Sequence, residues 1–193
     1  MSSILKVDQL QDSGGNAIIT SNGSGTFTSS LPNTGITMAD QWRLTTTFSG
    51  NVDPISSNLE RVDTTGQGTL GTGMTVSSGR FTFPSTGIYL VRFNHLMQFK
   101  DGNALFRAGR IKLTTNNSSY SVVATNGHSG LDEGYSKQSA ETLIDVTDTS
   151  NVKVSFATES MSSNDKTIAN TAQNETYFTF IRLGDTWWQI ENG

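Results

Sequence analysis

Short apolar segments with period-two alternation, separated by turns rich in glycine, asparagine, serine and threonine, run through the whole chain. Alternation with period two is typical of half-buried strands, and no segment has apolar residues at a convincing helical spacing. Frequent turn residues, among them 19 glycines, leave room for only short strands. The pattern therefore predicts an all-β, antiparallel sandwich or jelly roll rather than a parallel α/β fold.

The predicted strands fall into two groups on either side of a segment that contains both a proline and a glycine. The first group covers residues 4–10, 17–20 and 26–28. The second covers residues 42–48, 81–83, 88–99, 108–113, 120–125, 141–145, 152–158 and 175–183. We therefore expect an N-terminal β-meander arm at residues 1–30, a linker at 31–38, a β head at 39–184 and a C-terminal tail at 185–193.

The arm has too few apolar residues to stabilise a core of its own, because chains below about 40 residues seldom do so unaided. Its candidate docking residues are Ile4, Leu5, Val7, Leu10, Ile18, Ile19 and Phe27. These side chains are expected to pack against a different molecule.

Composition excludes several classes of protein. Hydrophobic residues make up only 34% of the chain, but ten Phe, four Tyr and three Trp provide the large buried areas that disordered chains lack. The net charge of −4, without any Lys/Arg cluster, makes nucleic acid a poor partner. There are no cysteines, no apolar run of about 20 residues and no signal-peptide pattern, so we expect cytoplasmic synthesis and no membrane insertion.

The segment from Gly79 to Tyr89 resembles the central motif of the jelly roll shared by complement component 1q heads and tumour necrosis factor. Gly79, Phe81, Pro84, Gly87 and Tyr89 occupy the positions of its Gly-x-Phe strand entry, its Pro/Gly turn and its following Tyr. Residues 139–154 resemble the family's paired strands around an Asp-containing turn, and residues 174–184 its aromatic closing strand. The resemblance covers about residues 40–184 and implies an antiparallel jelly-roll sandwich that assembles as a closed three-fold trimer.

The closing strand has apolar residues on both of its faces. Phe178 and Phe180 point to one side and can cover the core. Tyr177, Thr179 and Ile181 point to the other side, where exposed apolar surface favours a subunit contact. We therefore expect these three residues at a homotrimer interface. The long strand at residues 88–99 also has apolar residues on both faces, and the alternative is a central strand buried on both faces within one subunit.

The arm resembles the short N-terminal segments of bacteriophage tail-fibre and capsid-decoration proteins, on the residues 5–8 (Leu-Lys-Val-Asp) and 13–19 (Ser-Gly-Gly-Asn-Ala-Ile-Ile). The leading hypothesis is therefore a structural protein of a bacteriophage virion, with the arm docked on capsid, tail or fibre proteins and the head projecting outward. The alternative is a tail-associated adhesin that recognises a host surface glycan or protein. Its candidate contacts are the loop at residues 126–138, with His128, and the tail residues Trp187 and Trp188.

No local signature of a common enzyme is present, so we expect no catalytic activity, no cofactor and no metal site. His95 alternates with aromatic strand residues, which favours a core histidine over a general base. Oxygen-rich loops such as residues 63–66 and 145–148 do not match a calcium-binding spacing. A glycosidase with paired loop carboxylates is a third hypothesis, and its candidates are Asp132, Glu133, Asp145 and Asp148.

Overall fold

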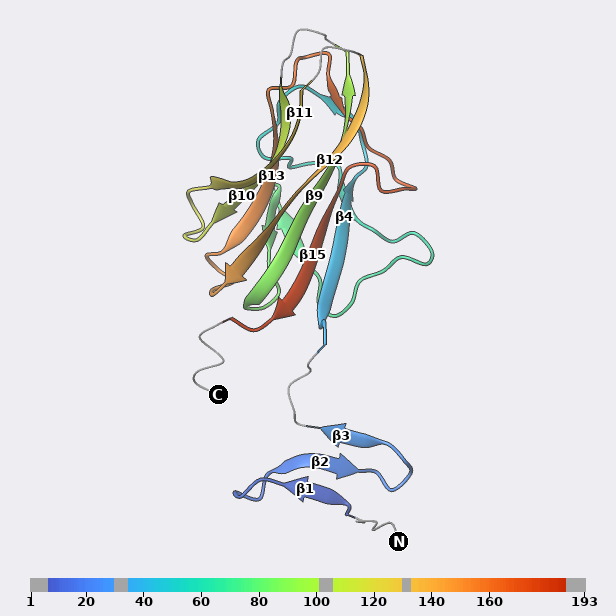
Figure 1. Ribbon diagram of the computed structural model, residues 1–193, viewed down its shortest axis with the longest axis vertical. Coiled ribbons are helices and arrows are strands. Elements are labelled where there is room, and N and C mark those ends of the chain that lie inside the picture. Colours follow the sequence, from blue (N-terminus) through green and yellow to red (C-terminus); the bar gives the residue numbers. More distant parts are fainter. Residues whose placement is uncertain (1–6, 30–34, 101–105, 130–132, 187–193) are drawn as a thin grey trace. The chain divides into compact units, whose positions relative to one another are not determined.

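The computed structural model describes residues 7–29, 35–100, 106–129 and 133–186, which form strands, turns and loops (Figure 1). None of these residues is helical, so none belongs to a helix that could cross a membrane. The chain divides into two compact units, Met1–Gly35 and Ile36–Gly193. The first contains the arm and the second the head.

The arm is a three-stranded antiparallel sheet, as the sequence predicts. Its strands are β1 (Gln9–Gln11), β2 (Ala17–Ser21) and β3 (Phe27–Ser29), in that spatial order. Not one of the side chains described between residues 7 and 27 is buried. The arm therefore has the hydrogen bonding of a sheet without a hydrophobic core among these residues.

Two tight turns shape the arm, and each is organised by one side chain. The Asp12 carboxylate accepts hydrogen bonds from the backbone N–H groups of Gly14 and Asn16, both at 2.9 Å. In the second turn Asn22 Oδ1 accepts from the backbone N–H of Ser24 at 2.8 Å. Such Asx turns are local, so the strand connections of the arm do not depend on a packed interior.

The head is a sandwich of two antiparallel sheets (Figure 1). The smaller sheet has the order β11-β10-β13-β8-β7, with β7 at Thr75–Ser77, β8 at Arg80–Thr82, β10 at Arg107–Thr114, β11 at Ser121–His128 and β13 at Lys153–Glu159. The larger sheet has the order β5-β14-β9-β15-β4-β6, in which β14 and β15 pair with different parts of the same edge of β9. The strand β12 pairs with the opposite edge of β9. The strands of the larger sheet are β4 (Met38–Leu44), β5 (Phe48–Ser49), β6 (Leu59–Arg61), β9 (Gly87–Phe99), β12 (Gly134–Val146), β14 (Lys166–Thr167) and β15 (Tyr177–Gly184).

Aromatic side chains from both sheets form the centre of the core. Phe156 of β13 lies 4.2 Å from Phe178 of β15, and Phe81 of β8 lies 5.1 Å from Phe180, both measured between ring centroids. All four side chains have at most 1% exposure. Aromatic pairs at these distances add stability beyond the area they bury, so this cluster holds the two sheets together.

The glycines of the Gly79–Tyr89 motif are required by close backbone approaches. A Cβ at Gly79 (φ +74°) would lie 2.5 Å from the carbonyl oxygen of Ile55, and one at Gly87 (φ +142°) 2.5 Å from that of Gly184. Between them the chain passes from β8 in the smaller sheet to β9 in the larger one. The expected hairpin-like corner at Pro84 is therefore a crossover between sheets.

Other strand assignments also need correction. The strand expected at residues 42–48 ends at Leu44, β12 begins at Gly134 instead of residue 141, and the short strands β5, β6, β7 and β14 were not predicted. The strands around the Asp148 turn, β12 and β13, belong to different sheets and do not pair with each other. Short strands with only two or three residues have no period that a sequence pattern can detect.

His95 is a core residue, as expected from its alternation. Its side chain is fully buried, its ring centroid lies 5.2 Å from that of Phe93, and its Nε2 is 2.9 Å from Thr167 Oγ1. Burial lowers the pKa of His95 to about 3, because the charged imidazolium would lose its hydration. The imidazole is therefore neutral at physiological pH.

The depressed pKa of His95 predicts a loss of stability in mild acid. Between its unfolded pKa near 6.5 and its folded pKa, the unfolded chain binds the extra proton, so the free energy of unfolding falls by about 1.4 kcal/mol per pH unit. Urea unfolding at one fixed protein concentration should show that His95→Gln loses about 2 kcal/mol less than the wild type between pH 7 and pH 5. His128→Gln is the control and should follow the wild type. Parallel curves for the wild type and His95→Gln would contradict the assignment.

Candidate functional site

The outer face of the larger sheet, opposite the core, carries a continuous row of apolar side chains. Leu90 of β9 lies between Leu143 of β12 and Ile181 of β15. Ile181 in turn pairs with Ala39 of β4, which forms a β-bridge with Leu70. Residues directly opposite in antiparallel strands have Cβ atoms about 5 Å apart, so these five side chains are neighbours. We call them the apolar row.

The apolar row is open to solvent in the single chain. Leu143 is 63% exposed and Leu70 50% exposed, and Leu183, just beyond Ile181 on β15, is 48% exposed. Exposed apolar surface that continues across several strands marks a contact surface more often than scattered single residues do. The row is therefore the candidate functional site of the head.

A buried carboxylate holds Leu70 in this row. Asp40 of β4 is 1% exposed, and it accepts hydrogen bonds from the backbone N–H of Met74 at 2.7 Å and from Trp42 Nε1 at 3.0 Å. Arg61 pairs with the same carboxylate at 3.1 Å. These contacts tie the segment between Arg61 and Met74 to β4, and the sequence showed no sign of them because the partners come from three separate segments.

The three expected interface residues lie on the outer face, in three different surroundings. Ile181 belongs to the apolar row. Thr179 accepts a hydrogen bond from Gln41 Nε2 at 3.1 Å, and the ring centroid of Tyr177 lies 5.1 Å from Lys137 Nζ. Thr179 pairs across strands with Arg92, which forms an ion pair of 2.6 Å with Glu141. The outer face is thus apolar at one end and polar farther along.

The alternative of a strand buried on both faces within one subunit is wrong for this chain. Phe178 and Phe180 are completely buried, whereas Tyr177, Thr179 and Ile181 are only half-buried. The strand β9 repeats this difference between its two faces. Among the described residues, the inner face of the larger sheet is covered and its outer face is not.

The expected ligand loop at residues 126–138 is largely strand. Residues 126–128 end β11 and residues 134–138 begin β12. His128 is not a loop-tip residue, because it is half-buried and its ring stacks on Phe99 with centroids 4.4 Å apart. Trp187 and Trp188 lie outside the described residues, as do Ile4 and Leu5 of the arm and the candidate carboxylate Asp132.

Of the other candidate carboxylates, Asp148 lies in the turn between β12 and β13. Asp148 stabilises its own turn by accepting hydrogen bonds from the Ser150 backbone N–H at 2.7 Å and from Asn151 Nδ2 at 2.6 Å. These hydrogen bonds lower the pKa of Asp148 and keep it ionised. Over the described ranges of the chain, no three His, Asp or Glu side chains are grouped so that they could hold a metal ion.

The arm presents the remaining predicted site residues. Val7 is 57%, Leu10 52% and Phe27 68% exposed, while Ile18 and Ile19 are half-buried. A pocket of about 380 Å³ lies on the arm, lined by Ile19, Ser21, Gly25, Thr26 and Phe27. The arm therefore displays apolar side chains beside a hollow.

No protein-family model matches the chain, and no curated protein is similar to it in sequence. Solved structures are similar in fold. Eiger TNF from S. frugiperda superposes with a TM-score of 0.59, covering 79% of this chain and 96% of its own at 11% identity. Murine APRIL at pH 5.0 superposes with a TM-score of 0.57, covering 76% of this chain and 98% of its own at 10% identity. Similarity at this level of identity concerns the fold, and the head therefore has the jelly-roll fold of tumour-necrosis-factor-like proteins.

Proposed function

We propose that the chain is a homotrimeric structural protein of a bacteriophage virion, a capsid-decoration or fibre protein whose arm docks on the particle and whose head projects outward. The observation that carries this proposal is the contrast between the two units. The head has a closed aromatic core, whereas the arm has ordered turns and strands but no buried side chain between residues 7 and 27. A sheet of this kind gains its stability from a partner.

The docking role of the arm is supported by the kind of surface it offers. Leu10 and Phe27 are both more than half exposed, and Phe27 also lines the pocket of the arm. Apolar anchors beside a hollow are the features that protein interfaces use most. The resemblance of the arm to the N-terminal segments of phage fibre and decoration proteins makes another virion protein the proposed partner.

The trimer is supported by the apolar row and by the jelly-roll fold. The row crosses the outer face of the sheet that contains β15, where the resemblance to tumour necrosis factor and complement component 1q implies three-fold contacts. The charges beside it, Arg92 and Glu141, already form an ion pair within one chain. Burial of the apolar row thus removes apolar surface from water.

A second candidate function is a tail-associated adhesin that recognises a host surface glycan or protein. A pocket lined by Lys100 and Lys166, which form no ion pair with the described residues, favours it, because the pocket lies at the end of the head opposite the start of β4. A receptor bound at that end would be distant from the start of β4, which follows the linker.

Introduction of positive charges into the apolar row tests the trimer. The wild type should sediment at three times its chain mass of 20.8 kDa, and Leu143→Arg with Ile181→Arg should sediment as a folded single chain. The reason is that six unpaired arginines would be buried in the assembled interface. The matched control is Val122→Arg with Val123→Arg on β11, where both valines are 41% exposed, and this variant should remain a trimer. A monomeric wild type would refute the trimer.

Substitution of the exposed arm residues tests docking. Leu10→Asp with Phe27→Asp should abolish co-purification of the tagged chain with particles of the phage that encodes it, because the charges prevent apolar contact. The melting temperature of the head and the trimer mass should not change. Val122→Asp with Val123→Asp should still co-purify. A chain without residues 1–30 should be trimeric and unattached, and its retention on particles would overturn the anchoring role.

A further inference from the structure

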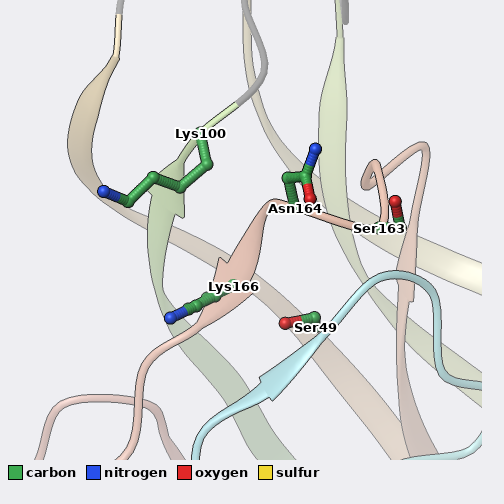
Figure 2. Close-up of a pocket in the computed structure, with 5 residues that line it drawn as sticks. All are labelled: Ser49, Lys100, Ser163, Asn164 and Lys166. Atoms are coloured by element: carbon green, nitrogen blue, oxygen red, sulfur yellow. The ribbon is translucent and has the colours of Figure 1, made fainter.

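A hollow of about 420 Å³ lies at one edge of the larger sheet (Figure 2). Its described lining is Ser49, Lys100, Ser163, Asn164 and Lys166. Lys166 of β14 pairs across strands with Ser49 of β5 on one side and with Gln98 of β9 on the other. Lys100 follows the last residue of β9, so both lysines extend from neighbouring strands, and Figure 2 shows them reaching toward the same side.

The two lysines have no acidic partner among the residues that the structure describes. Neither Lys100 nor Lys166 forms an ion pair with any described residue, and no carboxylate is found in the described lining of the hollow. A hollow of about 200 Å³ on the smaller sheet is different, because its cations are paired there, Arg110 with Glu159 and Lys112 with Asp53. The described lining of the first hollow is therefore positive, in a chain whose net charge is −4.

A buried ion pair beneath the hollow holds its walls in place. The Asp165 carboxylate is 0% exposed and accepts hydrogen bonds from Arg107 Nε at 2.6 Å and from the backbone N–H groups of Lys100 and Ser162, both at 3.0 Å. The Gly50 N–H, next to Ser49, donates to the Asp165 carbonyl at 3.1 Å. One residue thus joins all three segments that line the hollow.

Asp165 does not neutralise the lysines above it. Burial raises the pKa of Asp165, but the hydrogen bonds from Arg107, Lys100 and Ser162 outweigh this effect and lower the pKa below its usual value. The carboxylate is therefore ionised and its charge is balanced by Arg107. A preorganised wall whose ammonium groups have no acidic partner among the described residues suits an anion, since little has to be ordered on binding.

The hollow also lies far from the end of the head that leads to the linker. Arg182 of β15 pairs with Met38 at the start of β4 and with Tyr89 near the start of β9. Lys166, in contrast, pairs with Gln98 near the end of β9. Nine residues of extended strand separate these levels, or about 30 Å. A large ligand could therefore reach the hollow while the linker end is occupied.

We infer that this hollow binds a sugar unit that carries a carboxylate or phosphate group, with Lys100 and Lys166 on the anionic group. The hydroxyls of Ser49 and Ser163 and the amide of Asn164 both donate and accept hydrogen bonds, which suits the hydroxyl groups of a sugar ring. A volume of 420 Å³ is within the roughly 300–1,000 Å³ of small-molecule sites. Each of the five described lining residues carries a polar or charged group, which favours such a ligand over an apolar one. The inference depends on neither the arm nor the trimer.

Titration of the isotope-labelled full chain with glucuronate and glucose 6-phosphate, followed by NMR amide shifts, tests this site. Both ligands should shift the amides of Lys100, Asn164 and Lys166, and Lys100→Gln with Lys166→Gln should weaken both affinities about tenfold or more, because charge-assisted hydrogen bonds are lost. Raising the salt concentration from 50 to 500 mM should weaken binding to the wild type, because salt screens the exposed charges.

The matched control is Lys112→Gln with Lys153→Gln, which removes the same charge from the smaller sheet and should bind like the wild type. Neutral glucose should bind at least tenfold more weakly than glucuronate. The inference is overturned if neither anionic sugar binds at millimolar concentration, or if the control loses affinity equally. It is also overturned if acetate and inorganic phosphate bind as tightly as their sugar counterparts, which would reduce the hollow to a site for simple ions.

Discussion

The pairing of β9 with β12 on one edge and with β15 and β14 on the other positions the surfaces described for the head. All 13 residues of β9 pair with β12 without a register shift, and the opposite side of β9 pairs with β15 and then with β14. Because side chains alternate along a strand, this register places one set of residues in the core and the other set on the outer face. A shift of the β9 register by one residue would place Asn94 instead of Phe93 in the core and would separate the residues of the apolar row.

Two buried carboxylates hold connecting segments in place beneath the surfaces of the head. Asp40 ties a long connection to β4 and brings Leu70 into the apolar row, while Asp165 ties three segments around the hollow. Each carboxylate is buried, so loss of its partners would leave an uncompensated charge in the protein interior. The two proposed contact surfaces of the head thus rest on electrostatic anchors that lie beneath them.

The arm and the head differ in how their strands are held together. The head has its own aromatic core. The arm uses local Asx turns to prepare a sheet whose apolar residues stay exposed. Such a division fits a protein that folds first and attaches afterwards, which is the order that the proposed virion role requires.

The sequence by itself determined the all-β class, the position of most long strands and the inner face of β15, because alternation with period two and turn residues are local signals. It also identified Gly79 and Gly87, whose lack of a Cβ the crossover between sheets requires. The arm was recognisable because its apolar content is too low for a core. Within the candidate interface, the sequence placed Tyr177, Thr179 and Ile181 on one face but did not separate apolar Ile181 from the polar surroundings of the other two.

Only the tertiary structure decided which residues from distant segments meet. Leu70 and Leu143 join Ile181 in one row, and Lys100 joins Lys166 at one hollow, through strand registers and buried carboxylates that no local pattern encodes. The assignment of β12 and β13 to opposite sheets was likewise invisible in the sequence. The physical reason is that strand pairing joins residues far apart in the chain, so its outcome depends on the packing of the whole sandwich and not on any single segment.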